Sequence, residues 1–161
     1  MEKLSVKNNY EDKMIIKDKI ALGTIAGIVA TIPQILINVL SVQIGITPHY
    51  AFQYAASIFV YKNLTSTFGG LLFGWLIWES MAAGLGVVTV YLIDWTGKDY
   101  WWLKGMLISN TLMFIFMYGF YFGLEAPKLV AWDLETNWTF FIENLAFGVT
   151  AGYFSVRWRN K

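Results

Sequence analysis

The stretch that decides the fold is GGLLFGWLIWESMAAGLGVVTVYLI, residues Gly69 to Ile93. It is long enough to cross a lipid bilayer as a helix, since about 20 apolar residues suffice. A single acidic residue, Glu79, stands close to its middle. A charged side chain at that depth costs roughly 2.5–3.5 kcal/mol on insertion scales, so its surroundings must offset that cost. The stretch therefore predicts a membrane-spanning helix and makes Glu79 the first candidate for a functional site.

The composition extends this prediction to the whole chain of 161 residues. Apolar residues make up 57% of the sequence and charged residues only 14%, whereas a soluble domain has about 25% charged residues. Several apolar runs reach membrane-spanning length, so we expect a single-domain, all-α integral membrane protein, a bundle of four transmembrane helices. The net charge of +1 gives no case for nucleic-acid binding. The absence of cysteine excludes disulfides, thiolate metal sites and cysteine nucleophiles.

The apolar runs and the residues between them give the order of segments. Residues 1–19 form a charged cytoplasmic tail without the apolar core of a cleavable signal peptide, so the first helix should be an uncleaved anchor. A single membrane domain over residues 20–158 follows. It includes a short interfacial helix at about 48–61, which lies in the interface or folds over the bundle, with Thr47 as its N-cap and Pro48 in its first position. The four spans are expected at about 20–44, 69–93, 100–124 and 138–158, and residues 159–161 form a basic C-terminus.

The charges between the predicted spans give an orientation. Ten of the twelve Lys and Arg residues fall in the N-terminal tail, the C-terminus, and the region of the polar turn over residues 94–99. The opposite side holds only Lys62 and Lys128, the latter in an acidic loop over Glu125–Asn137. By the positive-inside rule, both termini are expected in the cytoplasm.

Each predicted span contains a pair of glycines four residues apart. In lipid, small residues let helix backbones approach closely, and dispersion then stabilises the contact. Four pairs in four spans predict a closely packed bundle within the lipid bilayer, with faces left for self-association as a homo-oligomer. The pairs are Gly23 and Gly27, Gly70 and Gly74, Gly119 and Gly123, and Gly148 and Gly152.

Polar side chains within the predicted spans gather in the central and outer half of the bilayer. Glu79 shares a helix side with Ala82, Ala83 and Gly86, which predicts that it points into the bundle. No Lys, Arg or His lies at its depth, so we expect it to be protonated and hydrogen-bonded, to face water, or to hold a cation. Glu143 is expected at a shallower depth, where it reaches the interface. The candidate site comprises Glu79, Gln34, Asn38, Asn110, Glu143 and Asn144.

Two interpretations of this polar set stay open. In the first, a protonated Glu79 bonds to Gln34 or Asn110 and joins the helices of a structural or accessory, self-associating bundle. In the second, the set binds protons, a cation or a small polar solute that enters from outside, in a small transporter or channel-like protein. A third hypothesis is an intramembrane enzyme that uses Glu79 and Glu143 as acid and base. Because no catalytic, phosphate-binding or metal-ligand motif is present, we expect no enzyme, metal or cofactor.

The layout resembles small bacterial integral membrane proteins of the YqhR-like and YagU-like type. The similar features are GTIAG at Gly23–Gly27, a Pro-containing outer segment, LKGML at Leu103–Leu107, an outer loop with Pro127, and the pair Glu143-Asn144. The resemblance is architectural and spans most of the chain. It implies a plasma-membrane protein with no established biochemical activity, and it assigns no site residue.

Overall fold

The computed structural model describes residues 16–119, 129–131 and 133–159, and most of them are helical. The only β-type contact within these ranges is an isolated bridge between Ile16 and Arg159. The predicted all-α class is therefore confirmed. The elements are α1 (Lys19–Gln43), α2 (Ala51–Ser57), the 3-10 turn η1 (Lys62–Leu64), α3 (Phe68–Thr96), α4 (Trp101–Tyr118) and α5 (Leu134–Arg157).

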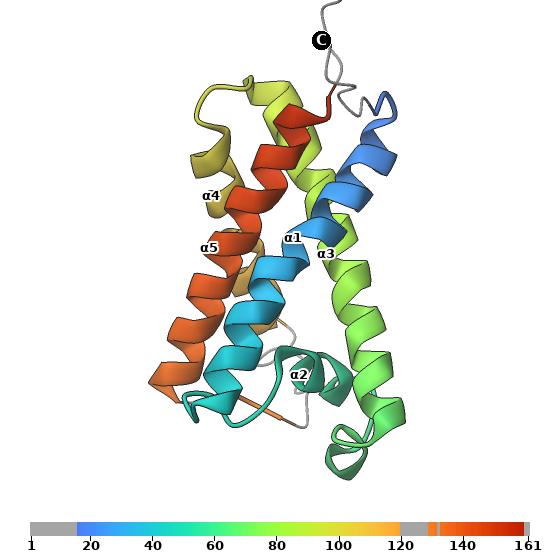
Figure 1. The fold of residues 1–161 in the computed structure, drawn as a ribbon, viewed down its shortest axis with the longest axis vertical. Coiled ribbons are helices and arrows are strands. Elements are labelled where there is room, and N and C mark those ends of the chain that lie inside the picture. The colour runs from blue at the N-terminus through green and yellow to red at the C-terminus, as the bar shows by residue number, and fades with distance from the viewer. Residues whose placement is uncertain (1–15, 120–128, 132, 160–161) are drawn as a thin grey trace, which may run out of the picture.

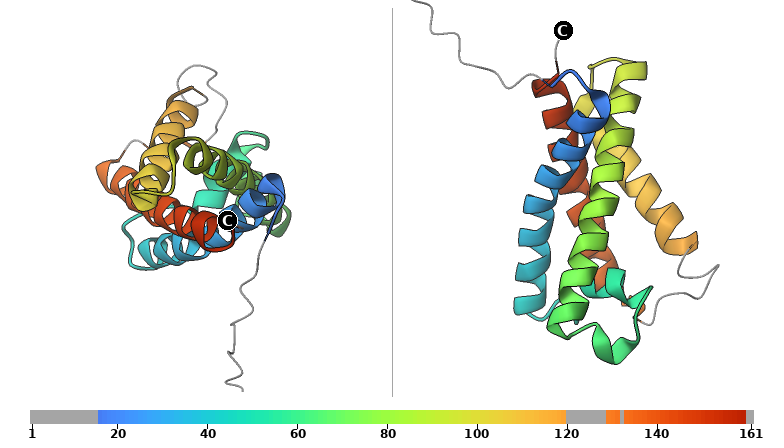
Figure 2. Two further views of the ribbon diagram at one scale, coloured as in Figure 1. Left: turned by 90° about the horizontal axis from the view of Figure 1, so that it is seen from above. Right: turned by 90° about the vertical axis from the view of Figure 1, so that its right-hand side faces the viewer.

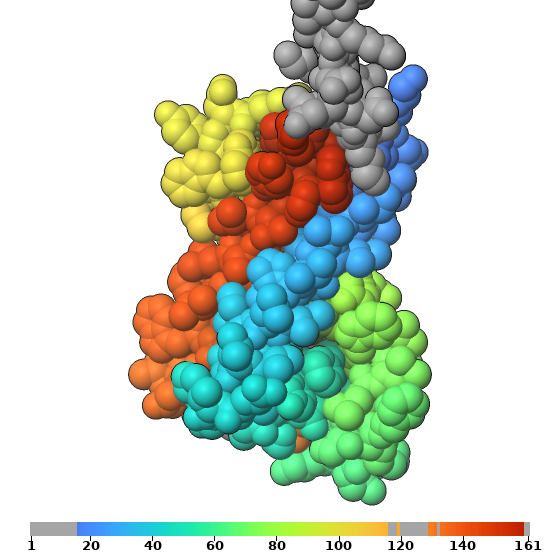
Figure 3. Space-filling model, in the orientation of Figure 1, coloured from blue at the N-terminus to red at the C-terminus, as the bar shows by residue number. Residues whose placement is uncertain are grey.

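The four long helices of the described chain lie side by side, and α2 packs across one end of them (Figure 1). α1 contacts both α3 and α5, and α5 also contacts α4. α4 leans away from α3 toward the end that holds α2 (Figure 2). Figure 3 shows α1 and α5 next to each other on one face of the molecule. At the opposite end from α2, the Ile16 N–H donates to the Trp158 carbonyl at 2.9 Å, so the first and last described segments meet.

α1 and α3 are the two described helices that are long and apolar enough to cross a membrane. α1 has an outer face of exposed large apolar residues: Ile28, Ile32, Leu36 and Leu40. Its inner face is buried and holds the small and polar residues Gly23, Gly27, Ala30, Gln34, Asn38 and Ser41. This division is typical of a helix with one face toward lipid. Membrane crossing by α4 and α5 stays a prediction.

The predicted end of α3 is wrong by about one turn. The helix continues through Asp94, where a polar turn was expected, and ends at Thr96. Gly97 follows with a φ of 89°, a conformation that glycine adopts without steric cost. Lys104 Nζ donates to the carbonyls of Thr96 and Gly97 at 3.0 and 2.9 Å, which satisfies carbonyl groups left free at the helix end.

α5 begins at Leu134 and not at about residue 138, so the last part of the predicted acidic loop is also wrong. The Asp133 carboxylate caps the helix by accepting a hydrogen bond from the Thr136 N–H at 2.7 Å. Glu135 then lies in the first turn, where the helix dipole favours a negative charge. The acidic residues here start a helix and do not prolong a loop.

The tail before residue 16 and the predicted end of α4 at residues 120–124 lie outside the described residues.

The predicted interfacial helix is shorter than expected and folds over the bundle. α2 covers only Ala51–Ser57, and Thr47 and Pro48 precede it without starting a helix. Its first turn is closed by the Tyr50 N–H, which donates to Gln53 Oε1 at 2.8 Å. Five of its seven residues are buried, so it is an internal packing element at one end of the molecule.

Glycines bring the helix backbones together in two places. A Cβ on Gly27 would overlap the Ala82 carbonyl of α3, and a Cβ on Gly86 would overlap the Gly23 carbonyl of α1. Between α4 and α5 the contact is mutual, because a Cβ on either Gly105 or Gly148 would overlap the other's carbonyl. At Gly152 the neighbouring backbone is that of Trp101.

The remaining predicted glycine pairs differ from this pattern. Gly70 and Gly74 do not face another long helix. A Cβ at these positions would overlap the carbonyls of Leu64 in η1 and Phe52 in α2. A Cβ on Gly119 would meet nothing within 4 Å, and Gly123 lies outside the described residues.

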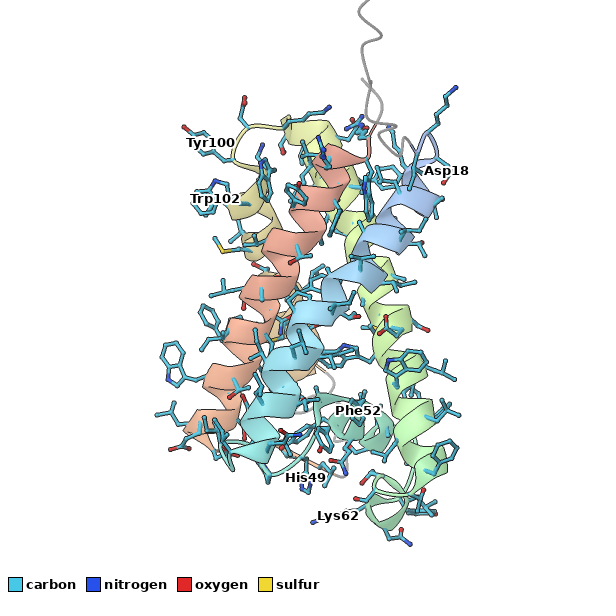
Figure 4. All side chains as sticks on the ribbon, viewed as in Figure 1. Asp18, His49, Phe52, Lys62, Tyr100 and Trp102 are labelled. Carbon is cyan, nitrogen blue, oxygen red and sulfur yellow. The ribbon has the colours of Figure 1, made fainter. Side chains whose placement is uncertain are left out.

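The two ends of the molecule carry different polar groups. His49 and Lys62 lie near the end with α2, whereas Asp18, Tyr100 and Trp102 lie near the other end (Figure 4). At that second end the Asp94 carboxylate forms ion pairs with Lys19 and Arg159. These pairs tie the start of α1 and the end of the described chain to α3.

Candidate functional site

The side-chain amide of Asn38 is buried and bonds to two other helices of the described chain. Its Nδ2 donates to Glu143 Oε1 at 2.9 Å, and its Oδ1 accepts from the Ala51 N–H at 2.9 Å. The first bond joins α1 to α5, and the second holds the N-terminus of α2, whose first N–H groups have no partner within the helix. One side chain thus joins α1 to the neighbouring α2 and to α5, which lies 105 residues further along the chain at the bonded position.

Glu143 is fully buried, with a relative exposure of 0%. The expectation that it reaches the interface is therefore wrong. It lies more than two turns inside α5, on the side that packs against α1. Its Oε2 is buried and has no hydrogen-bond partner, and no Lys, Arg or His of the described chain pairs with its carboxyl group. A charge at this position would be buried without a counterion, which is costly in any low-dielectric interior.

Glu79 is half-buried at the contact between α3 and α1, and its partner is Thr31. The expected bonds to Gln34 or Asn110 are not formed. Thr31 Oγ1 lies 3.0 Å from Glu79 Oε1 and 2.7 Å from the Ile28 carbonyl oxygen, while the hydroxyl carries a single proton. An uncharged Glu79 satisfies both contacts, because its own proton bonds to Thr31 and leaves the hydroxyl proton for Ile28, whereas a charged Glu79 would have to share that proton in a three-centre bond. The geometry therefore fits an uncharged Glu79.

The third polar group joins α4 to α5. Ser109 Oγ donates to the Asn144 carbonyl at 2.6 Å, and Asn144 Nδ2 contacts the Phe140 carbonyl at 2.8 Å and Met113 Sδ at 2.9 Å. Asn110 bonds within its own helix: its Nδ2 donates to the Met106 carbonyl at 3.1 Å, and its buried Oδ1 has no partner in the described structure. Asn144 is therefore an inter-helix contact, whereas Asn110 is not.

Gln34 belongs to none of these groups. It is only 4% exposed, and its side-chain amide forms no hydrogen bond to any described residue. It lines a cavity of about 310 Å³ that lies between α1, α2, α3 and α5 and also touches Met113 of α4. The wall is predominantly apolar and includes Tyr54, Trp78, Ala82 and Phe147.

The six predicted residues thus do not form one site. Glu143 bonds to Asn38, Glu79 contacts Thr31, and Asn110 bonds within α4. Gln34 and Asn144 both line the cavity, and no hydrogen bond joins them. Within residues 16–119, 129–131 and 133–159, no group of three His, Asp or Glu side chains is placed to hold a metal ion. The carboxyl groups of Glu79 and Glu143 bond to different partners, so the structure offers no shared acid and base.

Sequence reasoning missed Thr31, Ser109 and the backbone N–H of Ala51. Hydroxyl side chains inside apolar helices bond so often to their own backbone that their pattern carries little signal. Ala51 is an apolar residue, and only the position of α2 makes its N–H a partner for Asn38. One available signal was the position of Thr31, which lies two turns before Asn38 on the same side of α1.

The end that holds α2 carries the titratable groups with clear shifts outside the long helices. Burial and the nearby Lys62 ammonium lower the pKa of His49 below its usual value. Burial and the nearby Asp133 carboxylate raise the pKa of Tyr54 to about 12. Hydrogen bonding from Thr136 holds the pKa of Asp133 below its usual value. At neutral pH His49 and Tyr54 are therefore uncharged, and Asp133 is a carboxylate.

Comparison of the chain with protein-family models, with curated proteins and with solved structures gives no match. The resemblance to YqhR-like and YagU-like proteins stays a prediction.

Proposed function

We propose that this chain is a four-span integral protein of the plasma membrane, with both termini in the cytoplasm, and that it has a structural or accessory role without catalysis or transport. Its buried polar residues join helices within the bundle. The lipid bilayer is its solvent, and its stability depends on close backbone contacts and a few inter-helix hydrogen bonds.

The observation that carries the proposal is that Asn38 bonds to both Glu143 and Ala51 in a fully buried place. A solute site requires polar groups that turn toward a shared space. Here the two carboxyl groups turn to different helix contacts, and each has one oxygen bonded to a side chain of α1. This arrangement favours a structural role over a path for protons or cations.

Two further observations support the membrane setting. The outer face of α1 exposes Ile32, Leu36 and Leu40 at 57–59% each, which a water-soluble core helix would cover. α4 and α5 have 18 and 24 described residues, which correspond to about 27 and 36 Å of helix, and a bilayer core is about 30 Å thick. The end with Lys19, Lys104 and Arg159 would lie in the cytoplasm by the positive-inside rule.

Except for Gly119, the described glycines of the predicted pairs are not free to mediate self-association. Their small faces are covered within one chain, by α1 against α3, by α4 against α5, and by α2 and η1 against α3. A homo-oligomer would have to use the apolar outer faces of the helices.

Single-cysteine labelling tests the membrane topology, since the natural chain has no cysteine. Lys62→Cys and Lys98→Cys place a thiol at the two opposite ends, both in exposed positions. In intact cells a membrane-impermeant maleimide should label position 62 only, and position 98 should react after permeabilisation. Equal labelling of both positions in intact cells would refute the proposed orientation.

A flux assay tests the role. The purified protein in liposomes should move neither protons nor monovalent cations above the level of empty liposomes. A flux that the wild type shows and Glu79→Gln abolishes, with the fold intact, would establish the transporter hypothesis in place of ours.

A further inference from the structure

We propose that the interior cavity is a binding site for an uncharged lipid that carries a small carbonyl headgroup on an apolar chain, with the carbonyl oxygen bound to the side-chain amide of Gln34. The inference rests on the proposed membrane setting, because the cavity then opens toward the hydrocarbon of the bilayer.

The cavity has a mouth and an inner end. Phe59 and Met81, which line it, are 63% and 44% exposed and so mark the mouth. Gln34, Ala82 and Phe147 are at most 4% exposed and mark the inner end. The mouth is apolar, and Met81 projects from α3, one of the two helices able to cross a membrane. A ligand would therefore enter from the lipid side and not from water.

Two polar groups of the lining have no hydrogen-bond partner in the described structure: the amide of Gln34 at the inner end and the indole N–H of Trp78 on the wall. The amide of Gln34 has two N–H donors and a carbonyl acceptor, and no described residue bonds to them. Leaving such a group unpaired in an apolar place is unfavourable, and a ligand that accepts from it removes that cost. Asn38, one turn away on the same helix, is bonded to Glu143 and Ala51, so of these two amides the one without a partner is the one that lines the cavity.

The wall selects against charge. Its lining residues include no Lys, Arg, His, Asp or Glu among the described residues. A phosphate or carboxylate headgroup would lose its hydration without gaining a counterion. A compact neutral acceptor, such as an ester or quinone carbonyl, takes an N–H from Gln34 and leaves its chain along Met81 and Phe59. The volume of about 310 Å³ is at the lower end of ligand pockets, which run from about 300 to 1,000 Å³. This volume suits a small headgroup with the first part of a chain.

Quenching of tryptophan fluorescence measures the binding, because Trp78 lines the cavity. The probes are the methyl ester of a dibrominated stearate and the same dibrominated stearate as the free anion, titrated at pH 8.5 into the purified protein in detergent. The ester should quench part of the fluorescence saturably, and Trp78→Phe should remove that part. The anion should show only unsaturable partition. Decyl-ubiquinone and monopalmitin, added as competitors, distinguish a quinone source from an acylglycerol source.

Two variants and a control test the assigned contact. Gln34→Leu should weaken ester binding about fivefold, the equivalent of one net hydrogen bond. Gln43→Leu makes the same chemical change at an exposed position on α1 and should leave binding unchanged. Ala55→Phe places a large ring in the cavity lining and should abolish saturable quenching, which keeps the test decisive if Gln34→Leu does not fold.

The inference fails if the ester quenches only by partition, if the anion binds as tightly as the ester, or if Gln34→Leu or Ala55→Phe binds like the wild type. Such a failure leaves the membrane topology untouched, since cysteine labelling at positions 62 and 98 reports that separately.

Discussion

Asn38 of α1 donates its amide N–H to the buried carboxyl group of Glu143 in α5 at 2.9 Å. The two residues are 105 positions apart in the sequence, and the same Asn38 side chain also accepts the first N–H of α2. Each group would be costly to bury without a hydrogen-bond partner. The Asn38 amide supplies a donor, and the Glu143 carboxyl group supplies an acceptor. The contact therefore fixes α1, α5 and α2 relative to one another at the end of the bundle away from the described termini.

The first prediction concerns the cost of removing this contact. Asn38→Leu breaks both hydrogen bonds and leaves two buried groups without partners, so it should lower the free energy of unfolding by about 2–4 kcal/mol. Asn110→Leu is the matched control, because Asn110 bonds only within α4 and has an unpaired buried oxygen. It should cost less than about 1 kcal/mol. Unfolding in mixed micelles with increasing SDS measures both. Equal losses in the two variants would contradict the assigned role of Asn38.

The second prediction concerns the proton on Glu79. Glu79→Gln keeps an N–H that donates to Thr31 Oγ1, so the midpoint of thermal unfolding in detergent should change little. Thr31→Val removes the hydroxyl with almost no change of shape and should cost about 0.6–1.7 kcal/mol, the range for inter-helix hydrogen bonds in a membrane protein. A large destabilisation by Glu79→Gln would show that Glu79 is charged in the fold.

The third prediction compares two glycines. Gly105→Ala places a methyl group against the backbone of Gly148, and it should destabilise the pair α4 and α5 by about 1–3 kcal/mol, as overpacking does. Gly84→Ala is the control, since a Cβ there meets nothing within 4 Å. It should be neutral or stabilising by up to about 1 kcal/mol, because alanine favours the helix. Thermal unfolding of both proteins in one detergent provides the comparison, and the reverse order would refute the close contact.

The fourth prediction is a pH dependence. Burial and Lys62 lower the pKa of His49, so the fold favours the neutral ring. The contribution of His49 to the free energy of unfolding should therefore be fully present above pH 6.5, the value for an unperturbed histidine. The free energy of unfolding should decrease as the pH falls below that value. His49 is the only histidine, which makes its NMR titration unambiguous. Lys62→Met should move the pKa part of the way back toward 6.5. A titration at or above 6.5 in the wild type would disagree with the structure.

The sequence predicted the helices better than the contacts between them. The small and polar residues of α1 from Gly23 to Ser41 recur at helical spacing in the sequence, and the structure buries them on one face of the helix. Helix ends were less predictable: Asp133 and Gly97 act through local capping geometry, which shifted the start of α5 and the end of α3.

The candidate site illustrates why the rest could not be predicted. Depth along a helix suggested that Glu143 is shallow and Glu79 is the deep acid. In the structure Glu143 is fully buried where α1 packs against α5, while Glu79 lies half-buried against Thr31. The burial of a side chain depends on which neighbouring helix packs against it. The hydrophobic periodicity of one helix does not specify that neighbour, and it does not specify the position of a seven-residue helix such as α2.

A double-mutant cycle on Asn38 and Glu143 tests the central claim most directly. Asn38→Leu, Glu143→Met and the combined variant are unfolded under the same conditions, and the coupling free energy is taken from the four proteins. If the contact joins the helices as proposed, the two substitutions are strongly non-additive, with a coupling of about 1 kcal/mol or more. Additive losses, with a coupling below about 0.3 kcal/mol, would contradict the account.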